Sequence, residues 1–312
     1  MAKPEVLLVG SRPDWYVERL AEDFTLHRIA DDNPSLLETG VAQRIEVVAS
    51  GGVLRRPLIE ALPRLRLVVH GAAGFERVDV DALRERRILM TTTPGVADGC
   101  VADMAFALLL AVGRSVVPGD RFVRAGLWSG GGDFPLVPRL FGRPVGILGL
   151  GGIGLAIARR AAGFDMPVFY HNRRPREDVP YAYCDSPLEL ARRCDVFMVA
   201  CPGGDETRHI VNAEVLDALG SSGIIVNIAR GSIIDEGALI VALREKRIFG
   251  AGLDVFEHEP SVPAELIAAE NAVLMPHRGG GSSETWRDAC DLVKANMRAY
   301  FEGRPLVSPL AL

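Results

Sequence analysis

The sequence predicts an α/β fold with two doubly wound parallel sheets. Short apolar runs alternate along the chain with amphipathic stretches, which is typical of buried strands and the helices that cover them. The alternation forms two series, one before residue 98 and one from Pro144 onward. The length of 312 residues also corresponds to two domains at roughly 150 residues each.

The first series accounts for the first sheet. Four apolar runs, at residues 6–9, 45–49, 65–70 and 88–91, are predicted to be buried strands. The stretches 15–22, 57–62 and 80–85 between them are predicted to be helices. Pro94 and Gly95 then mark the end of this region.

A different pattern separates the two series. Residues 101–114 are apolar nearly all round, so we expect a buried helix at a domain or subunit interface. Residues 126–138 contain Trp128, three consecutive glycines and two prolines, and this composition disfavours regular structure.

The second series supplies the second sheet. Its predicted strands lie at residues 145–148, 168–170, 196–200, 224–227, 250–254 and 273–275. Helices are expected to begin near Ile153, Pro187, Asn212 and Asp235, and an amphipathic helix at 283–302 closes the chain.

Composition excludes several classes of protein. A hydrophobic share of 48% excludes a globally disordered chain. Thirty-five basic against forty acidic residues give a net charge of −5, so we expect no nucleic-acid partner. The five cysteines form no CxxC pair, which disfavours a zinc ribbon or a disulfide framework. The longest apolar run, 104–112, is shorter than the roughly 20 residues of a membrane span, and we expect a cytoplasmic protein with no metal and no membrane partner.

A glycine-rich segment opens the second series. Gly149, Gly151 and Gly154 form a G-x-G-x-x-G pattern directly after the strand at 145–148, and Gly152 and Ile153 begin the next helix. In this context the glycines permit a tight turn and let the backbone approach a pyrophosphate at the positive end of the helix. The pattern therefore predicts a dinucleotide site.

The next strand end bears on the choice of dinucleotide. A site for NAD usually carries a carboxylate about 20 residues after the fingerprint. Here the strand is followed instead by Asn172, Arg173 and Arg174, which suit a 2′-phosphate. We therefore predict NADPH over NADH. The alternative is an exposed basic loop paired with Glu177 and Asp178.

Three later strand ends carry polar residues in apolar surroundings. Arg230 follows the strand at 224–227, Asp254 and Glu259 follow or end the strand at 250–254, and His277 follows the last strand. Because ligands bind beyond the carboxyl ends of parallel strands, a cation, a carboxylate and a histidine are expected to converge there.

At this point the motifs can be taken together. The segments N-I-A-R-G-S at 227–232, G-L-D-V-F at 252–256 with Glu259-Pro260, and Pro276-His277 accompany the fingerprint. The sequence resembles the D-isomer-specific 2-hydroxyacid dehydrogenases, and within them the glyoxylate/hydroxypyruvate reductases, over nearly its whole length. The resemblance implies two Rossmann-like domains: a discontinuous flavodoxin-like substrate domain (1–98 and 285–312) and an inserted NAD(P)-binding Rossmann domain (99–284).

The resemblance also implies roles for the polar residues. Arg230 is expected to bind the 2-oxoacid carboxylate and polarise the keto oxygen, and His277 to donate a proton to that oxygen. Glu259 is expected to bond the other imidazole nitrogen and favour the protonated form. Asp254 is expected to contact the nicotinamide carboxamide, with a loop cap as its alternative. Val101 touches the nicotinamide or simply packs in the core.

The first domain is expected to hold the substrate. By resemblance, the backbone N–H groups of Ala73 and Gly74 bind the substrate carboxylate, and the turn at Gly52 closes the other side of the pocket. In relatives the loop that corresponds to Trp128 often covers the active site of a partner subunit. A homodimer is therefore expected.

The expected activity is NADPH-dependent reduction of small 2-oxoacids, glyoxylate and hydroxypyruvate, to glycolate and D-glycerate. The enzymatic alternatives are a hydroxyphenylpyruvate or phenylpyruvate reductase and a 2-ketogluconate reductase. An NADPH-sensing binding protein or corepressor is the alternative from another class, and absence of turnover would distinguish it.

Overall fold

The chain folds into two compact units. The computed structural model describes residues 3–312, except for the side chain of Thr39. Unit 1 comprises the residues up to Ala97 together with Gly281–Leu312, and unit 2 comprises Asp98–Gly280. The boundaries expected from the sequence, after residues 98 and 284, lie one and four residues away. The closing helix falls wholly within unit 1, because its N-cap, Ser282, lies after the second boundary.

Unit 1 contains a six-stranded sheet. The strand order is β13 (Pro309–Leu310), β5 (Leu89–Thr91), β4 (Leu67–His70), β3 (Val47–Ser50), β1 (Glu5–Val9) and β2 (Thr25–Ile29). Strands β1 to β5 pair in parallel, and β13 adds an antiparallel edge. The chain runs outward from β1 in both directions, so the topological switch point lies between β1 and β3.

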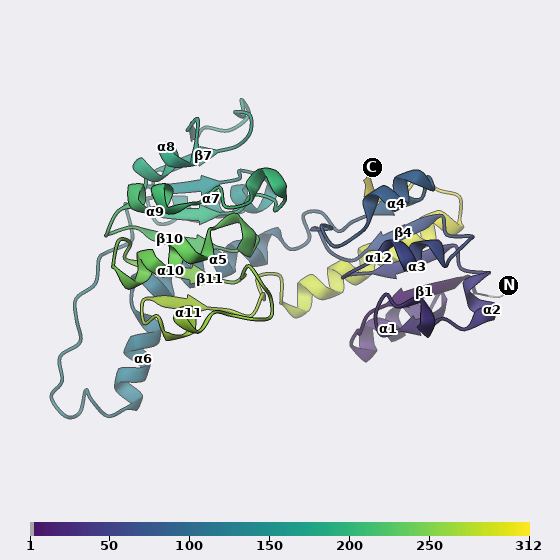
Figure 1. The fold of residues 1–312 in the computed structure, drawn as a ribbon, viewed down its shortest axis with the longest axis horizontal. Coiled ribbons are helices and arrows are strands. Elements are labelled where there is room, and N and C mark those ends of the chain that lie inside the picture. Colours follow the sequence, from purple (N-terminus) through teal and green to yellow (C-terminus); the bar gives the residue numbers. More distant parts are fainter. Residues whose placement is uncertain (1–2) are drawn as a thin grey trace. The chain divides into compact units, whose positions relative to one another are not determined.

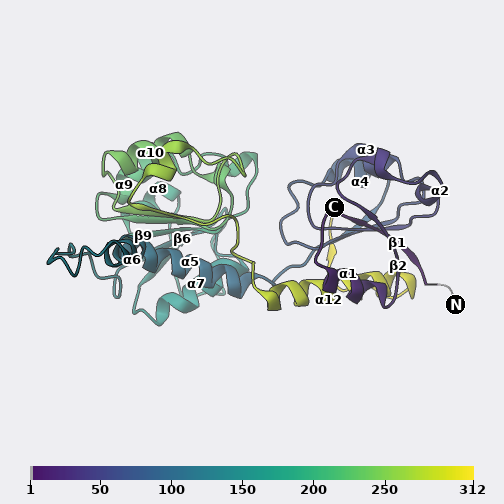
Figure 2. The same ribbon diagram turned by 90° about the horizontal axis from the view of Figure 1, so that it is seen from below.

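Helices cover both faces of this sheet. Figure 2 shows α1 (Asp14–Ala21) and α12 (Ser283–Phe301) on one face, and α3 (Arg56–Glu60) and α4 (Val80–Glu85) on the other. Successive side chains of β1 enter opposite cores: Val6 packs with α1 and α12, whereas Leu7 packs with α3 and α4. The short α2 (Thr39–Ala42) precedes β3.

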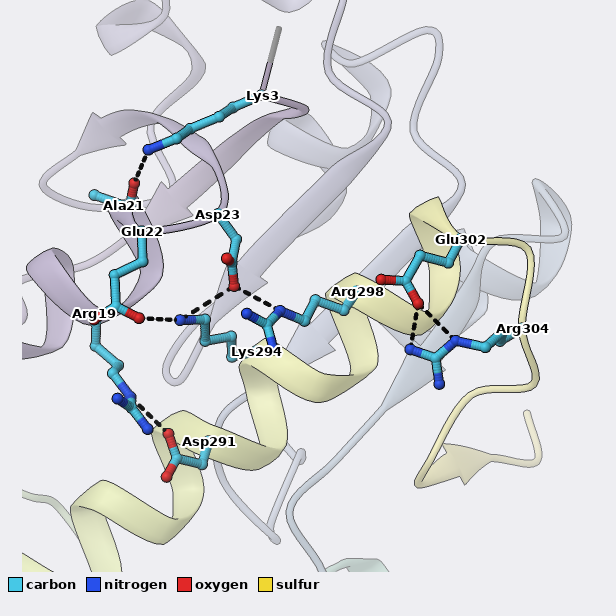
Figure 3. A network of polar contacts seen from close by, with 10 residues as sticks. All are labelled: Lys3, Arg19, Ala21, Glu22, Asp23, Asp291, Lys294, Arg298, Glu302 and Arg304. Carbon is cyan, nitrogen blue, oxygen red and sulfur yellow. Dashed lines mark hydrogen bonds and ion pairs between the residues drawn. The ribbon is translucent and has the colours of Figure 1, made fainter. Parts of the chain in front are cut away.

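A polar network joins α1 to α12 across the edge of the core (Figure 3). The side chain of Lys294 on α12 is only 7% exposed, and its Nζ lies 2.5 Å from Glu22 Oε2 and 3.1 Å from Asp23 Oδ2. Arg298 donates from Nε to the same Asp23 oxygen at 2.6 Å. The nearly buried ammonium is therefore matched by two carboxylates, as burial of a charge requires.

Unit 2 contains a seven-stranded sheet in which every pairing is parallel. The order is β12 (Ala272–Leu274), β11 (Gly250–Leu253), β10 (Ile224–Asn227), β9 (Val196–Val199), β6 (Val145–Leu148), β7 (Val168–His171) and β8 (Ala182–Tyr183). The switch point lies between β6 and β9.

Helices again lie on both faces (Figure 2). On one side are α8 (Pro187–Arg192), α9 (Ala213–Leu219) and α10 (Glu236–Arg244), and on the other are α5 (Asp98–Gly113) and α7 (Gly152–Ala162). The apolar α5 packs on α7, β10 and β11, which explains why it is apolar nearly all round. The short α11 (Ala264–Ala268) precedes β12.

These two doubly wound sheets confirm the predicted fold class. The sequence prediction was wrong in omitting β2, β8 and β13, which lie at sheet edges and lack an apolar run. It also omitted α6 (Val116–Arg124), which carries Pro118 in its first turn, where no intrahelical N–H bond is needed. As predicted, residues 126–138 contain no helix or strand. They follow α6 and extend with it away from the sheet of unit 2 (Figure 1).

Among residues 3–312, no single helix is both long and apolar enough to cross a membrane. Helices α5 and α6 reach the required length only as a pair, and the chain bends by 59° between them.

Candidate active site

The glycine fingerprint forms the turn between β6 and α7. Gly149 has φ +100°, and a Cβ at this position would lie 2.4 Å from the backbone nitrogen of Cys201. A Cβ at Gly154 would lie 2.2 Å from the carbonyl oxygen of Gly149. Gly151 caps α7 without any side-chain bond and has open space in front of it. The first N–H groups of α7 therefore remain available to an anion.

A groove of about 1,200 Å³ lies at this switch point. Its walls bring together most of the predicted cofactor residues, namely Gly149, Gly151, Gly152, Ile153, Asn172, Arg173 and Arg174. The volume exceeds the roughly 300–1,000 Å³ usual for drug-sized ligands. The turn, the helix end and the size of the groove all fit a dinucleotide.

The basic loop after β7 is tied to the glycine turn. Asn172 Oδ1 accepts a hydrogen bond from the Leu150 N–H at 2.7 Å. Arg173 is 87% exposed and pairs with Glu206 on the opposite wall of the groove, Nη1 to Oε2, at 3.0 Å. Asp178, one of the partners in the alternative interpretation of this loop, pairs with Arg176.

Arg230 lies just beyond β10 on a fixed stretch of backbone. The buried Asn227 accepts from the Ala229 N–H at 3.1 Å and donates from Nδ2 to the Arg230 carbonyl at 2.9 Å. Arg230 itself donates from Nη1 to the Ala229 carbonyl at 2.7 Å. These bonds therefore fix the backbone from which the Arg230 side chain extends.

Gly231 brings the loop after β10 against the loop after β11. A Cβ at Gly231 would lie 1.9 Å from the carbonyl carbon of Phe256 and 2.3 Å from the Glu257 nitrogen. No larger residue fits unless one of these backbones moves. Because position 231 is a glycine, the loop that carries Glu259 can lie against the loop that carries Arg230.

Glu259 and His277 form the central pair of the site. Glu259 Oε2 lies 2.8 Å from His277 Nδ1, and Oε1 accepts from the Phe256 N–H at 3.2 Å. Both oxygens of the Glu259 carboxylate are therefore engaged in hydrogen bonds. With Nδ1 donating to Glu259, the Nε2 of His277 is left to bond a different partner.

The backbone of His277 is held in an unusual conformation. Its φ is +54°, in the left-handed region that costs a non-glycine residue roughly 1 kcal/mol or more. Asp254, only 1% exposed, accepts from the Arg278 and Gly279 N–H groups at 2.7 Å each. Asp254 therefore anchors the turn that presents the histidine. Its contact with a nicotinamide stays a prediction.

Val101 and Glu257 complete the surroundings in unit 2. Val101 is buried in α5, and its methyl groups lie 3.5 Å from the place a Cβ would take at Gly279. The Oε1 of Glu257 accepts from Arg208 Nη2 at 2.7 Å and lies 2.9 Å from His209 Nε2. This cluster fixes the loop beside Glu259.

The predicted substrate residues lie at the carboxyl edge of the sheet in unit 1. Ala73 and Gly74 follow β4, and the carbonyl of Gly74 lies 3.0 Å from His70 Nε2. Gly52 follows β3, and its N–H lies 3.4 Å from the Ser50 hydroxyl. These turns consist of small residues, of which Gly52 and Ala73 are exposed and Gly74 is half-buried.

Sequence reasoning missed part of the groove wall. The loop after β9, from Pro202 to Thr207, lines the groove together with Asp98 and Arg176. Burial raises the pKa of Asp98, and the charge of Arg159 partly offsets this. The position of the β9 loop could have been foreseen, because β9 is a neighbour of β6 at the switch point.

The arrangement in unit 2 defines a class of protein. A dinucleotide groove and an Arg, Glu and His set at the carboxyl ends of one parallel sheet are typical of a nicotinamide-dependent oxidoreductase. Within residues 3–312, no group of three or more His, Cys, Asp or Glu side chains is placed to hold a metal ion.

Comparison with known proteins gives the family. Residues 106–279 match the model of the D-isomer specific 2-hydroxyacid dehydrogenase NAD binding domain. The chain belongs to this family of enzymes, as its motifs indicated.

Individual relatives support the assignment over the whole chain. The chain is 47% identical to a hydroxyphenylpyruvate reductase of Plectranthus scutellarioides, over 81% of this chain and 80% of the relative. It is 42% identical to a glyoxylate/hydroxypyruvate reductase A of Arabidopsis thaliana, over 98% of both. A solved NADPH-dependent glyoxylate/hydroxypyruvate reductase from Sinorhizobium meliloti, in complex with NADP and malonate, has a TM-score of 0.94 and 40% identity, covering 99% of this chain and 97% of that one.

Proposed function

We propose that this chain reduces glyoxylate and hydroxypyruvate to glycolate and D-glycerate with NADPH. The observation that carries the proposal is the Glu259–His277 pair beyond β11 and β12, with Arg230 on the neighbouring loop beyond β10. The names of the relatives from Arabidopsis thaliana and Sinorhizobium meliloti support the same substrates.

The chemistry divides among these residues. When bound, the nicotinamide cofactor supplies a hydride to the keto carbon. Arg230 pairs with the substrate carboxylate and polarises the keto oxygen. His277 gives the proton on Nε2 to that oxygen, which becomes the hydroxyl of the product, and then regains a proton from solvent. Glu259 keeps the imidazole ring oriented through the bond to Nδ1.

Further binding groups are also proposed. The backbone amides of Ala73 and Gly74 are proposed to hold the substrate carboxylate, and the turn at Gly52 is proposed to close the other side of the pocket. Val101 and Asp254 are proposed to contact the nicotinamide, Val101 by packing and Asp254 through the carboxamide.

The preference for NADPH rests on the loop after β7. Asn172, Arg173 and Arg174 line the groove, and no carboxylate occupies the strand end where an NAD site usually has one. A 2′-phosphate would compete with Glu206 for Arg173 and form charge-assisted bonds.

A homodimer is also part of the proposal. Helix α6 and the segment after it carry exposed apolar side chains, among them Val123, Leu127, Leu136 and Trp128, which is 71% exposed. Apolar side chains gathered on one projecting segment mark an interaction surface. Light scattering is expected to give a dimer mass, and Trp128→Glu with Leu136→Glu to give a monomer. The cytoplasmic location stays a prediction.

A panel of 2-oxoacids tests the function. Purified protein is assayed with glyoxylate, hydroxypyruvate, hydroxyphenylpyruvate and 2-ketogluconate, each with NADPH and NADH. We expect the highest kcat/KM with glyoxylate or hydroxypyruvate and NADPH. Highest activity with hydroxyphenylpyruvate would favour the second candidate, which the 47% identical relative supports. Binding of NADPH without reduction of any 2-oxoacid would overturn the proposal in favour of a sensor.

A further inference from the structure

The residue between the first two glycines of the fingerprint is held on both sides by the loop after β7. The Leu150 N–H donates to Asn172 Oδ1 at 2.7 Å, and the Leu150 carbonyl accepts from Arg176 Nη1 at 2.8 Å. Among residues 3–312, these two side chains are the only hydrogen-bond partners of the Leu150 backbone. Leu150 is 1% exposed, so loss of either bond would leave a polar group of the glycine turn unpaired.

The loop that carries these side chains is itself held by the sheet. The buried Tyr170 on β7 accepts from the Arg176 N–H at 2.8 Å and donates to the Arg176 carbonyl at 3.3 Å. The Tyr183 hydroxyl on β8 donates to the Asn172 carbonyl at 3.1 Å. These bonds are made to backbone atoms, so a change of the side chain at 172 or 176 does not remove them. The strands therefore position the loop, and the loop in turn positions Leu150.

Arg176 differs in its contacts from Arg173, its neighbour on the same loop. The side chain of Arg173 is 87% exposed and pairs with Glu206. That of Arg176 is 29% exposed, and in addition to the bond with Leu150 its Nε and Nη2 both bond the Asp178 carboxylate. All three nitrogens of the Arg176 guanidinium are therefore engaged. Both arginines line the groove, but only Arg173 is presented to a ligand by an exposed side chain.

We propose that Asn172 and Arg176 are positioning residues, which hold the glycine turn in the conformation that receives the pyrophosphate. The inference rests on the proposed use of a nicotinamide dinucleotide. Because the pyrophosphate is common to NAD and NADP, these two residues support the binding of both cofactors alike. Asn172 thus acts separately from Arg173 and Arg174, with which the sequence grouped it, and its amide oxygen is occupied by the Leu150 N–H.

The position of the turn affects affinity because the backbone itself is the ligand-binding group there. Gly151 follows Leu150 directly and caps α7 with open space in front of it. The first N–H groups of the helix bind an anion without any side chain, provided that they are already in place. A turn that has lost one of its two anchors must be ordered by the ligand, and this ordering lowers the affinity.

Calorimetric titration with NADP⁺ and NAD⁺ tests the proposal without turnover. Arg176→Met removes the donor to the Leu150 carbonyl, and we expect Kd for both cofactors to rise by the same factor, about 3–30-fold. Asn172→Ala removes the acceptor for the Leu150 N–H and should also weaken both cofactors equally. Arg176→Lys keeps a donor and should restore part of the affinity. In each variant the ratio of the two Kd values should stay close to that of the wild type.

Two variants of the same loop are matched controls. Asp178→Asn disrupts the ion pair of Arg176 but leaves its bond to Leu150, so both Kd values should stay near those of the wild type. Arg173→Met removes an exposed arginine and should weaken NADP⁺ only. Weaker binding of NADP⁺ alone in Arg176→Met would make Arg176 a phosphate ligand and overturn the inference. A lower melting temperature with both Kd values unchanged would overturn it as well, because the bonds would then stabilise only the fold.

This inference and the proposed function fail in different ways. If the wild type reduces glyoxylate but the ratio of Kd values changes in Arg176→Met, the inference is wrong and the proposed function stands. If the wild type binds NADP⁺ but reduces no 2-oxoacid, the function is wrong, and the titrations still decide the role of Arg176. If the wild type binds neither dinucleotide, both are overturned.

Discussion

In both units, loops follow the carboxyl ends of a parallel sheet, but the residues in these loops differ. Beyond β10, β11 and β12 of unit 2, polar side chains fix one another in place: Asn227 holds the backbone of Arg230, and Glu259 holds the ring of His277. Beyond β1, β3 and β4 of unit 1 there are short turns of small residues, and the guanidinium of Arg12 lies over the turn at Gly51. The comparison fits the proposal that unit 2 carries the catalytic side chains and that unit 1 adds backbone donors for the substrate carboxylate.

The difference has a physical reason. Proton transfer requires a side chain held within a fraction of an ångström of its productive position, and this requires anchored neighbours. Recognition of a carboxylate needs only donors and positive charge, and backbone amides supply the donors without any side-chain entropy. Variants that change kcat and KM to different extents therefore test this division of roles between the two units.

The largest effect is expected at His277. His277→Ala removes the proton donor, and kcat should fall about 10²–10⁴-fold while KM changes little. Glu259→Gln keeps a hydrogen-bonding group beside Nδ1 but loses the charge, so we expect a smaller fall in kcat than in His277→Ala. The measurement is steady-state kinetics with glyoxylate from pH 5 to 9. A KM effect alone would contradict the assignment of chemistry to unit 2.

A second, smaller effect is expected at Arg230, which is proposed to serve both catalysis and substrate binding. Arg230→Lys keeps a cation but loses the paired geometry with a carboxylate, so kcat should fall and KM should rise, together lowering kcat/KM about 10²-fold. The Arg244→Lys variant, which alters an exposed arginine at the end of α10, is the control. An unchanged KM would remove Arg230 from substrate binding.

Much of this division was predictable from the sequence. The strand ends after residues 148, 227 and 254 were identified by apolar runs that stop at glycine or at a polar residue. Parallel strands then bring these ends to one edge, so the groove and the approach of Glu259 to His277 follow from chain order and spacing. The fingerprint at Gly149 was informative because it lay between a strand and a helix.

Other features depend on contacts that no local pattern encodes. Strand β2 carries His27 and Arg28 on a half-exposed edge, so it lacks the apolar run of a buried strand. The role of Asp254 as an anchor for the His277 turn depends on two backbone amides 24 and 25 residues away. The position of Arg12 over Gly51 requires that β1 and β3 be neighbours, which only the strand order shows.

A third prediction concerns the groove of unit 2 and its choice of cofactor. Replacing Arg173 and Arg174 together by Ser should raise KM for NADPH about 10–100-fold and leave KM for NADH within a few-fold, because only NADPH carries the 2′-phosphate. Tryptophan fluorescence titration with 2′,5′-ADP and 5′-AMP gives the same comparison without turnover. Equal weakening of both cofactors would remove the phosphate assignment.

The smallest effect is expected in the α1–α12 network of unit 1, which lies away from both edges. Lys294→Met removes the buried partner of Glu22 and one partner of Asp23 (Figure 3). We expect the melting temperature at pH 7 to fall by roughly 2–4 °C, with kcat and KM unchanged. Arg304→Met, which breaks only the exposed pair with Glu302, is the control and should shift the melting temperature less.

The pH dependence of this network tests its electrostatic origin. The Lys294 bond lowers the pKa of Glu22 below its usual 4.5, and the Arg298 and Lys294 bonds lower that of Asp23 below its usual 3.8. Folded protein therefore binds fewer protons than unfolded protein, so this stabilisation is complete above about pH 4.5 and is lost as pH falls further. The deficit of Lys294→Met relative to wild type should shrink between pH 5 and pH 3. A deficit that stays constant over this range would show that Lys294 acts through packing of its aliphatic stem and not through its charge.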